Sequence, residues 1–302
     1  MDSNHSSILD AAIQLREAGK INQAIELLRE EIKQFPEEAD LLALLSHCFI
    51  LADELGEAGL YLDRARQIAP ANASVGWNTA RLKLKEKNAS EALNVAKDTS
   101  RRFPEDIEGM GVLGACLRAN GYITEGLKVL NQAIELNSNY AEALVQRGLI
   151  RLSQESKPEA LADFEFAHSL KPHIKPIWDL IVGLKVEAQE YSDAILLLIN
   201  MIEIDPSWQK GFSLLAACNQ KVDDSALAVK SFEKVLEMNE HRIRDKALSI
   251  MGGYTYEDAQ LDGFQERVRI DLKKSFSMVL RKYRDGESDL IRQIYFTQFV
   301  VQ

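Results

Sequence analysis

The sequence contains few of the residues from which catalytic and metal sites are usually built. Only three cysteines and five histidines occur among its 302 residues. An odd number of widely spaced cysteines argues against a disulfide framework and favours a reducing compartment, for which we expect the cytoplasm. No two histidines have the i, i+4 spacing of metal ligands on one helix, and the glycines form no phosphate-binding loop. We therefore expect a protein that is not an enzyme and that has no metal, cofactor or catalytic site.

Long apolar runs and an excess of basic residues are also missing. No apolar segment reaches the roughly 20 residues that a membrane-spanning helix needs, and the polar segment Met1–Ser7 has no features of a secretory signal. The 36 basic and 46 acidic side chains give a net charge of −10, which disfavours nucleic acid because phosphate neutralisation requires an excess of Lys and Arg. The sequence thus predicts a folded, soluble protein that neither inserts into a membrane nor binds nucleic acid.

What the sequence does contain is an internal period of 34 residues. Most of its prolines lie on one lattice, at Pro36, Pro70, Pro104, Pro172 and Pro206, with Ser138 in the remaining slot. Twelve residues before each of these positions, and once beyond them, the residue is small: Ala24, Ala58, Ala92, Gly126, Ala160, Ala194 and Ala228. Four residues later comes a mostly bulky one: Leu28, Leu62, Ala96, Leu130, Phe164, Leu198 and Phe232. A small residue one helical turn from a large one is typical of a place where two helices cross.

Each unit is expected to be two amphipathic helices joined by a turn. The first half of each unit repeats its own mostly small column: Ala12, Ser46, Ala80, Gly114, Gly148, Val182 and Ala216. Gly19, Gly56, Gly121 and the pair Lys157 and Pro158 are the expected turn residues. Proline ends the unit because it cannot continue a helix. The predicted units are residues 5–38, 39–72, 73–106, 107–140, 141–174, 175–208 and 209–242, preceded by a tail (1–4) and followed by non-repeating C-terminal helices (243–302).

A 34-residue hairpin with small residues at its eighth and twentieth positions and proline at its thirty-second resembles the tetratricopeptide repeat. The resemblance extends over residues 5–242 and implies an all-α, right-handed superhelical solenoid with C-terminal capping helices. It also implies that the first helix of each hairpin lines a concave groove that binds a protein or peptide. Units three and five depart from the pattern, with Gly76, Lys83, Arg147 and Arg151 where apolar residues are usual. These departures predict poorer packing or a local specialisation.

The candidate binding site comes from this resemblance, because ligands of the family contact the second, fifth, ninth, twelfth and thirteenth positions of the first helices. Five such residues are expected to form one basic and aromatic patch: His47, Trp77, Arg81, Lys85 and Arg118. Guanidinium groups bind carboxylates bidentately, so we expect an acidic or C-terminal peptide in the groove. The alternative is a solvated groove whose charges satisfy one another. The family's carboxylate clamp is absent, since Leu9 and Ile13 stand at the clamp positions. The family's asparagine ladder is absent as well.

The last sixty residues predict further amphipathic helices. The final one carries Tyr295, Phe296 and Phe299, which suggest a partner or self-association surface, whereas the alternative is that these helices only cap the array. Three functions remain open at this point. The chain is a non-enzymatic scaffold or adaptor, a docking or regulatory arm of a larger sulfotransferase-like or glycosyltransferase-like enzyme continuing beyond residue 302, or a scaffold that forms homo-oligomers through its C-terminal helices.

Overall fold

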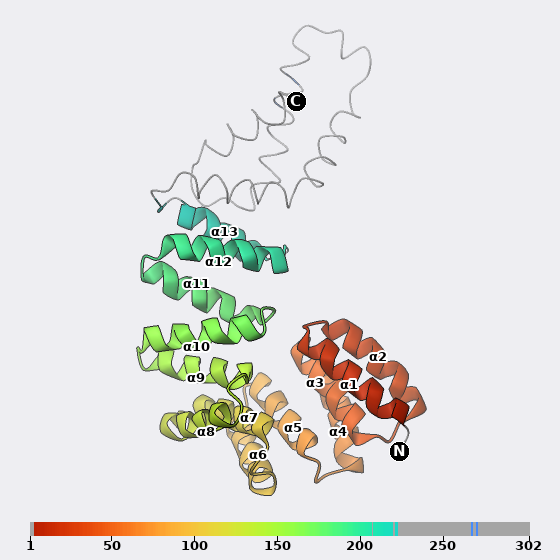
Figure 1. Cartoon of the computed structure of the whole chain (residues 1–302). Coiled ribbons are helices and arrows are strands. Elements are labelled where there is room, and N and C mark those ends of the chain that lie inside the picture. Colours follow the sequence, from red (N-terminus) through yellow and green to blue (C-terminus); the bar gives the residue numbers. More distant parts are fainter. Residues whose placement is uncertain (1–2, 207, 220, 223–266, 268–269, 271–302) are drawn as a thin grey trace, which may run out of the picture. The chain divides into compact units, whose positions relative to one another are not determined.

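The computed structural model describes residues 3–206, 208–219, 221–222, 267 and 270 (Figure 1). The chain divides into two compact units, Met1–Ile181 and Val182–Gln302, which are treated separately below. The described residues form helices and no strands, which confirms the predicted all-α hairpin array. Among the helices described, none is long and apolar enough to span a membrane.

The helices alternate between first and second members of each hairpin. The first helices are α1 (Ser3–Glu17), α3 (Ala39–Leu51), α5 (Ala73–Lys85), α7 (Ile107–Ala119), α9 (Ala141–Ser153), α11 (Trp178–Glu187) and α13 (Gln209–Asn219). The second helices are α2 (Ile21–Gln34), α4 (Leu55–Ile68), α6 (Ala89–Arg102), α8 (Ile123–Leu136), α10 (Lys157–Leu170) and α12 (Tyr191–Ile204). Each second helix ends two residues before the proline lattice position, as α2 does before Pro36. A 3-10 turn, Lys175–Ile177, precedes α11 and carries Pro176 near its start, where the missing N–H of proline is not needed.

The turns inside the hairpins confirm the prediction at Gly19 and Gly121 and differ from it elsewhere. Gly56 lies in the first turn of α4 and Pro158 in the first turn of α10, so assigning the turns to them was wrong. The chain turns at residues with positive φ that are 34 apart: Gly19, Asp53, Lys87, Gly121, Glu155 and Gln189. In the second hairpin the Glu54 N–H donates to the Phe49 carbonyl at 2.9 Å, the bond that closes a helix with a left-handed residue. Four of the six residues are not glycine, so composition alone does not reveal these turns.

The core follows the two columns of small residues. Ala24, Ala58 and Ala92 are completely buried. Gly148 has the same role in the fifth hairpin, where the ring of Phe164 occupies the space that a Cβ would need. The three cysteines, Cys48, Cys116 and Cys218, are buried and unpaired. Close helix crossings therefore hold the array together, and the first helices are brought side by side.

Candidate functional site

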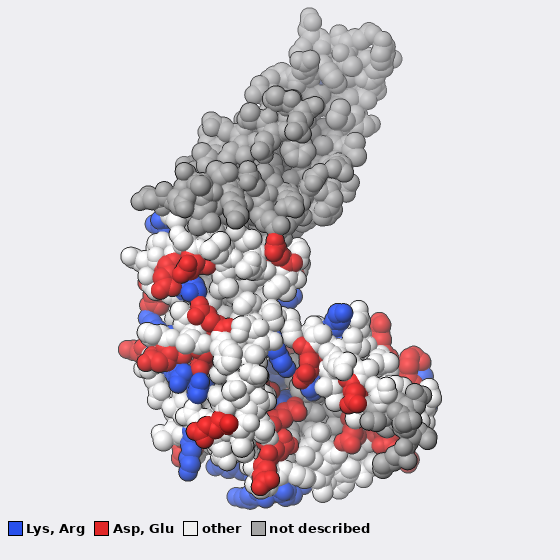
Figure 2. Space-filling view, viewed as in Figure 1, with Lys and Arg blue, Asp and Glu red and all other residues white. Residues whose placement is uncertain are grey.

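A hollow of about 160 Å³ lies among α1, α3, α5 and α7 in the first unit. Three of the five predicted groove residues line it: His47, Trp77 and Arg81. The remaining lining residues are Leu9, Ile13, Arg16, Asp40, Leu44, Ser74, Asn78, Asp106 and Glu108. Figure 2 shows acidic and basic side chains interleaved over the surface rather than gathered into one patch. The hollow is thus a mixed apolar and charged site.

Arg81 lies at the centre of this site and is already neutralised by its own chain. Its guanidinium forms ion pairs with Glu108 at 2.9 Å and Glu142 at 3.2 Å, and its side chain is only 10% exposed. It also donates to the side-chain amide oxygen Oδ1 of Asn78 at 3.0 Å. Burial by itself would lower the pKa of Arg81, but the two carboxylates have the larger effect and raise it above its usual value. The residue ties α5 to α7 and α9 instead of offering a free guanidinium.

Trp77 is almost completely buried against α7. Its indole N–H donates to the Asp106 carboxylate at 2.7 Å, and the other oxygen of Asp106 caps α7 by accepting from the Gly109 N–H at 3.1 Å. A Cβ on Gly109 would overlap the indole ring. Glycine is needed there because the ring lies directly on the helix backbone. Trp77 therefore serves packing between the third and fourth hairpins and presents no open stacking face.

His47 is buried at the base of the hollow and is paired with a residue that the sequence did not single out. The Arg16 guanidinium donates to Nδ1 of His47 at 2.9 Å. Burial lowers the pKa of His47 well below its usual value, and the charges of Arg81, Arg16 and Lys171 lower it further. The imidazole is consequently neutral. Arg16 occupies the twelfth position of the first unit, so the family pattern could have indicated it.

The two other predicted groove residues do not line the hollow. Lys85 pairs with Asp53 at 3.2 Å, with both side chains exposed. Arg118 donates from Nε to the side-chain amide oxygen Oε1 of Gln146 at 3.1 Å, and burial lowers the pKa of Arg118. The structure therefore does not join the five residues into one continuous patch.

The groups that the site presents to solvent are mainly carboxylates. Glu108 and Glu142 are 49% and 37% exposed, whereas the Arg16 and Arg81 side chains are only 15% and 10% exposed. The Tyr140 hydroxyl lies 3.2 Å from Glu142 and 3.0 Å from the Glu108 carbonyl, and burial raises its pKa well above its usual value. The more exposed charges of the site are thus carboxylates, and its guanidinium groups are largely buried.

The first and fifth hairpins touch across one side of this groove. Lys171 lies 3.5 Å from Glu17, and a Cβ on Gly19 would be 2.7 Å from the His173 ring. Repeats of a solenoid normally contact only their neighbours, so this contact, which we call the seam, is an exception.

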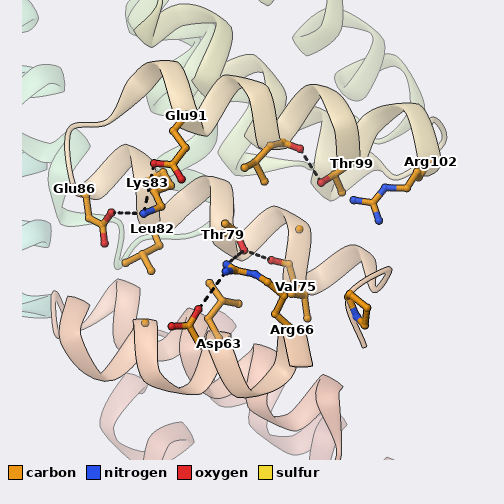
Figure 3. A pocket seen from close by; sticks show the side chains of 15 residues that line it. Asp63, Arg66, Val75, Thr79, Leu82, Lys83, Glu86, Glu91, Thr99 and Arg102 are labelled. Atoms are coloured by element: carbon orange, nitrogen blue, oxygen red, sulfur yellow. Dashed lines mark hydrogen bonds and ion pairs between the residues drawn. The ribbon is translucent and has the colours of Figure 1, made fainter. Parts of the chain in front are cut away.

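A second hollow, of about 330 Å³, lies between α4 and α6 with α5 as its floor (Figure 3). We call it the outer furrow. It belongs to the third unit, whose departures from the repeat pattern are Gly76 and Lys83. A Cβ on Gly76 would overlap Thr99, and Lys83 pairs with Glu86 at 3.0 Å and Glu91 at 3.6 Å. The Gly76 position is therefore closely packed, and Lys83 is held by two glutamates at the edge of the hollow.

In the fifth unit, the two arginines that depart from the repeat pattern, Arg147 and Arg151, form ion pairs with one buried carboxylate. Arg147 binds the Asp163 carboxylate with two hydrogen bonds of 3.0 and 2.7 Å, and Arg151 donates to the same carboxylate at 2.7 Å. The Asp163 side chain is only 4% exposed. Two cations and one buried anion take the place of apolar packing between α9 and α10.

Two family sequence models match the chain. The model for the Tetratricopeptide repeat matches residues 15–78, and the model for Flagellar basal body-associated protein FliL matches residues 213–302. The second match begins inside the range predicted as the seventh repeat, and it lies mostly outside the described residues, as do Tyr295, Phe296 and Phe299. No curated protein matches this sequence.

Solved structures are similar in fold. The crystal structure of the APC/C hetero-tetramer Cut9-Hcn1 has a TM-score of 0.57 and 17% identity, covering 76% of this chain and 45% of that chain. The human IFIT1 dimer with m7Gppp-AAAA has a TM-score of 0.57 and 14% identity, covering 87% and 67%. This chain thus spans less than half the length of the Cut9-Hcn1 chain it matches. At these identities the likeness concerns the helical-hairpin fold.

Proposed function

We propose that this chain, which is a tetratricopeptide repeat protein, is a non-enzymatic scaffold that holds an extended segment of another protein in the groove lined by α1, α3, α5 and α7. Tetratricopeptide repeats mediate interactions between proteins. The observation that carries the proposal is the hollow on the inner helices, where apolar side chains stand beside exposed carboxylates. Such a mixture suits one long side chain of a bound segment, because its stem and its polar end need different surroundings.

The charges favour a basic segment over the acidic peptide expected from the sequence. That expectation relied on Arg81, whose positive charge is already paired with the carboxylates of Glu108 and Glu142. The stem of a Lys or Arg residue would lie on the apolar wall formed by Leu9, Ile13 and Leu44. Its cationic end would then reach the exposed Asp40, which lines the hollow. A carboxylate in the same place would meet like charges first.

Binding of two matched peptides tests this proposal. Fluorescence anisotropy should show tighter binding of a labelled ten-residue peptide of alternating Lys and Leu than of its Glu and Leu counterpart. Asp40→Asn should weaken the Lys peptide by about 1 kcal/mol, roughly fivefold, because an exposed charge pair is partly screened by water. Glu37→Gln, an exposed change outside the hollow, is the matched control. Equal binding of the two peptides, or equal effects of the two substitutions, would refute the basic-segment proposal.

A second candidate role concerns the C-terminal part of the chain. The match to Flagellar basal body-associated protein FliL over residues 213–302 supports association of this part with a flagellar basal body, with the repeats free to hold another protein. Fluorescent fusions of the full chain and of a chain ending at Phe212 should differ in cells of the source organism. The full chain should colocalise with basal bodies and the shortened chain should not. Diffuse fluorescence from both would exclude this role.

Two other roles concern residues outside those described. A docking arm of a larger enzyme would require further coding sequence after Gln302. Homo-oligomers formed through Tyr295, Phe296 and Phe299 would appear as dimers in sedimentation equilibrium. Replacing the three aromatic residues by Ser should then return the chain to a monomer.

A further inference from the structure

The Arg16 side chain fixes which nitrogen of His47 carries the proton. Its guanidinium lies 2.9 Å from Nδ1 of His47. Arginine has only donors and keeps its proton, so Nδ1 must be the acceptor of this hydrogen bond. Burial and neighbouring cations also keep the imidazole neutral. The ring proton is therefore on Nε2, and this N–H points away from Arg16 because the two nitrogens lie on different sides of the ring.

The Nε2–H group of His47 donates to no acceptor among the described residues. His47 is 8% exposed and lines the hollow of about 160 Å³. The bond from Arg16 engages Nδ1, and Nε2 is not one of the described side-chain atoms that are sealed from solvent without a partner. The Nε2–H group therefore reaches the space of the hollow, where solvent hydrates it in the free protein.

Two other donors that line the hollow differ from His47 because they have partners within the protein. The Trp77 indole N–H donates to Asp106 at 2.7 Å, and Arg81 donates to Glu108 at 2.9 Å. An N–H group that loses its water without gaining another acceptor weakens binding. A segment that fills the hollow must consequently bring an acceptor to Nε2 of His47, and a ligand without one is disfavoured.

The charges around His47 favour an acceptor that is polar but uncharged. The ones that act on its imidazole are those of three cations: Arg16, Arg81 and Lys171. They attract the oxygen end of a carbonyl dipole and repel the cationic end of a basic side chain. Each cation is already paired with a glutamate of the chain, as Arg81 is with Glu108, so no full negative charge is required. A peptide carbonyl meets these conditions, and an extended segment has one at every residue.

We propose that His47 and Arg16 form a subsite of the groove in which Nε2–H of His47 donates a hydrogen bond to a backbone carbonyl of the partner segment. The subsite rests on the proposed function, because it assumes that a segment of another protein lies in the hollow. Asp40 binds the cationic end of a side chain, whereas His47 binds the main chain. His47 is thus a binding residue, and Arg16 is a positioning residue that keeps the proton on Nε2.

Nitrogen-15 nuclear magnetic resonance of the histidine rings in the full chain tests the subsite. In the free protein the His47 signals should show the proton on Nε2. The Lys and Leu peptide described above should shift the Nε2 signal and protect its proton from exchange with water, because a carbonyl then replaces solvent as the acceptor. The signals of His168, which does not line the hollow, should not move and serve as the reference.

Substitutions separate the hydrogen bond from mere packing. His47→Phe keeps a flat ring without the N–H and should weaken binding of the Lys peptide about fivefold, the contribution of one neutral hydrogen bond. Glu37→Gln, the exposed change outside the hollow, should leave binding unchanged. Arg16→Leu removes the donor to Nδ1 and should yield a mixture of both proton positions, whereas Arg16→Lys should restore the proton to Nε2.

The possible failures of the subsite and of the proposed function can be told apart. A proton on Nδ1 in the free protein, or binding of the Lys peptide that leaves Nε2 of His47 unchanged, would overturn the subsite alone. A larger Nε2 shift with the Glu and Leu peptide would show that the acceptor is a carboxylate and would overturn the carbonyl assignment. Absence of binding by either peptide would refute the proposed function, and the subsite with it. The spectra of the unsubstituted chain decide the matter even if His47→Phe does not fold.

Discussion

Replacing Asp163 by Asn should destabilise the first five hairpins more than any surface charge substitution. Asp163 is the shared acceptor of Arg147 and Arg151, and its side chain is only 4% exposed. Removing one partner of a buried ion pair leaves uncompensated charge and costs about 3–5 kcal/mol. The arginine side chains are 17% and 29% exposed, so water compensates them in part. We therefore expect a loss near the lower limit, about 3 kcal/mol.

Urea unfolding followed by circular dichroism measures this loss, with Asp98→Asn as the control. Asp98 pairs with Arg102 at 3.0 Å but is 63% exposed, so its substitution should cost less than about 1 kcal/mol. Replacing Asp163, Arg147 and Arg151 together by Leu should be neutral or stabilising, because no buried charge then remains. If Asp163→Asn costs no more than Asp98→Asn, the cluster is effectively solvated and the reasoning is wrong.

Three further predictions concern the groove and the buried thiols. His47 has a folded-state pKa below its unfolded value, so the unfolded chain binds the proton more readily and stability falls as the pH drops below about 6.5. His47→Gln should reduce this acid destabilisation, as measured by urea midpoints at several pH values, and an unchanged pH dependence would contradict it. Burial raises the pKa of Cys48 to about 11 and of Cys116 to about 12, so iodoacetamide should label both slowly in the native protein at neutral pH; rapid labelling detected by peptide mass spectrometry would count against their burial. Glu17→Lys should open the seam by placing like charges together with Lys171, lengthening the distance between spin labels on α1 and α10, and adding Lys171→Glu should restore it; an unchanged distance would mean that the ion pair does not hold the seam.

Much of the architecture could be predicted from the sequence because it depends on contacts that recur in every hairpin. Ala24, Ala58 and Ala92 mark helix crossings, and those residues are buried as expected. The positions of the prolines predicted the ends of the second helices, because proline cannot continue a helix. Of the hairpin turns, only those at Gly19 and Gly121 could be placed from the sequence. Residues such as Asp53 and Lys87 adopt left-handed geometry, which is imposed by the packing of two helices and has no glycine to mark it.

The candidate site was only partly predictable. His47, Trp77 and Arg81, which were selected from the family positions, line one hollow, because residues at similar repeat positions lie on the same face of neighbouring helices. The roles of these side chains depended on distant partners. Arg81 and Glu142 are 61 residues apart in sequence, and nothing in the period indicates that they meet.

The sequence by itself therefore determined the hairpin, its period and its buried columns, because these depend on helix-forming local patterns repeated between adjacent units. The tertiary structure alone decided which charged side chains are paired with a buried partner and which remain exposed. The seam between Glu17 and Lys171, the neutralisation of Arg81 and the outer furrow at Thr79 arise where separate helices come together. The physical reason is that an ion pair acts only at short range, so Glu17 with Lys171 and Arg81 with Glu142 interact only where tertiary packing brings their helices together.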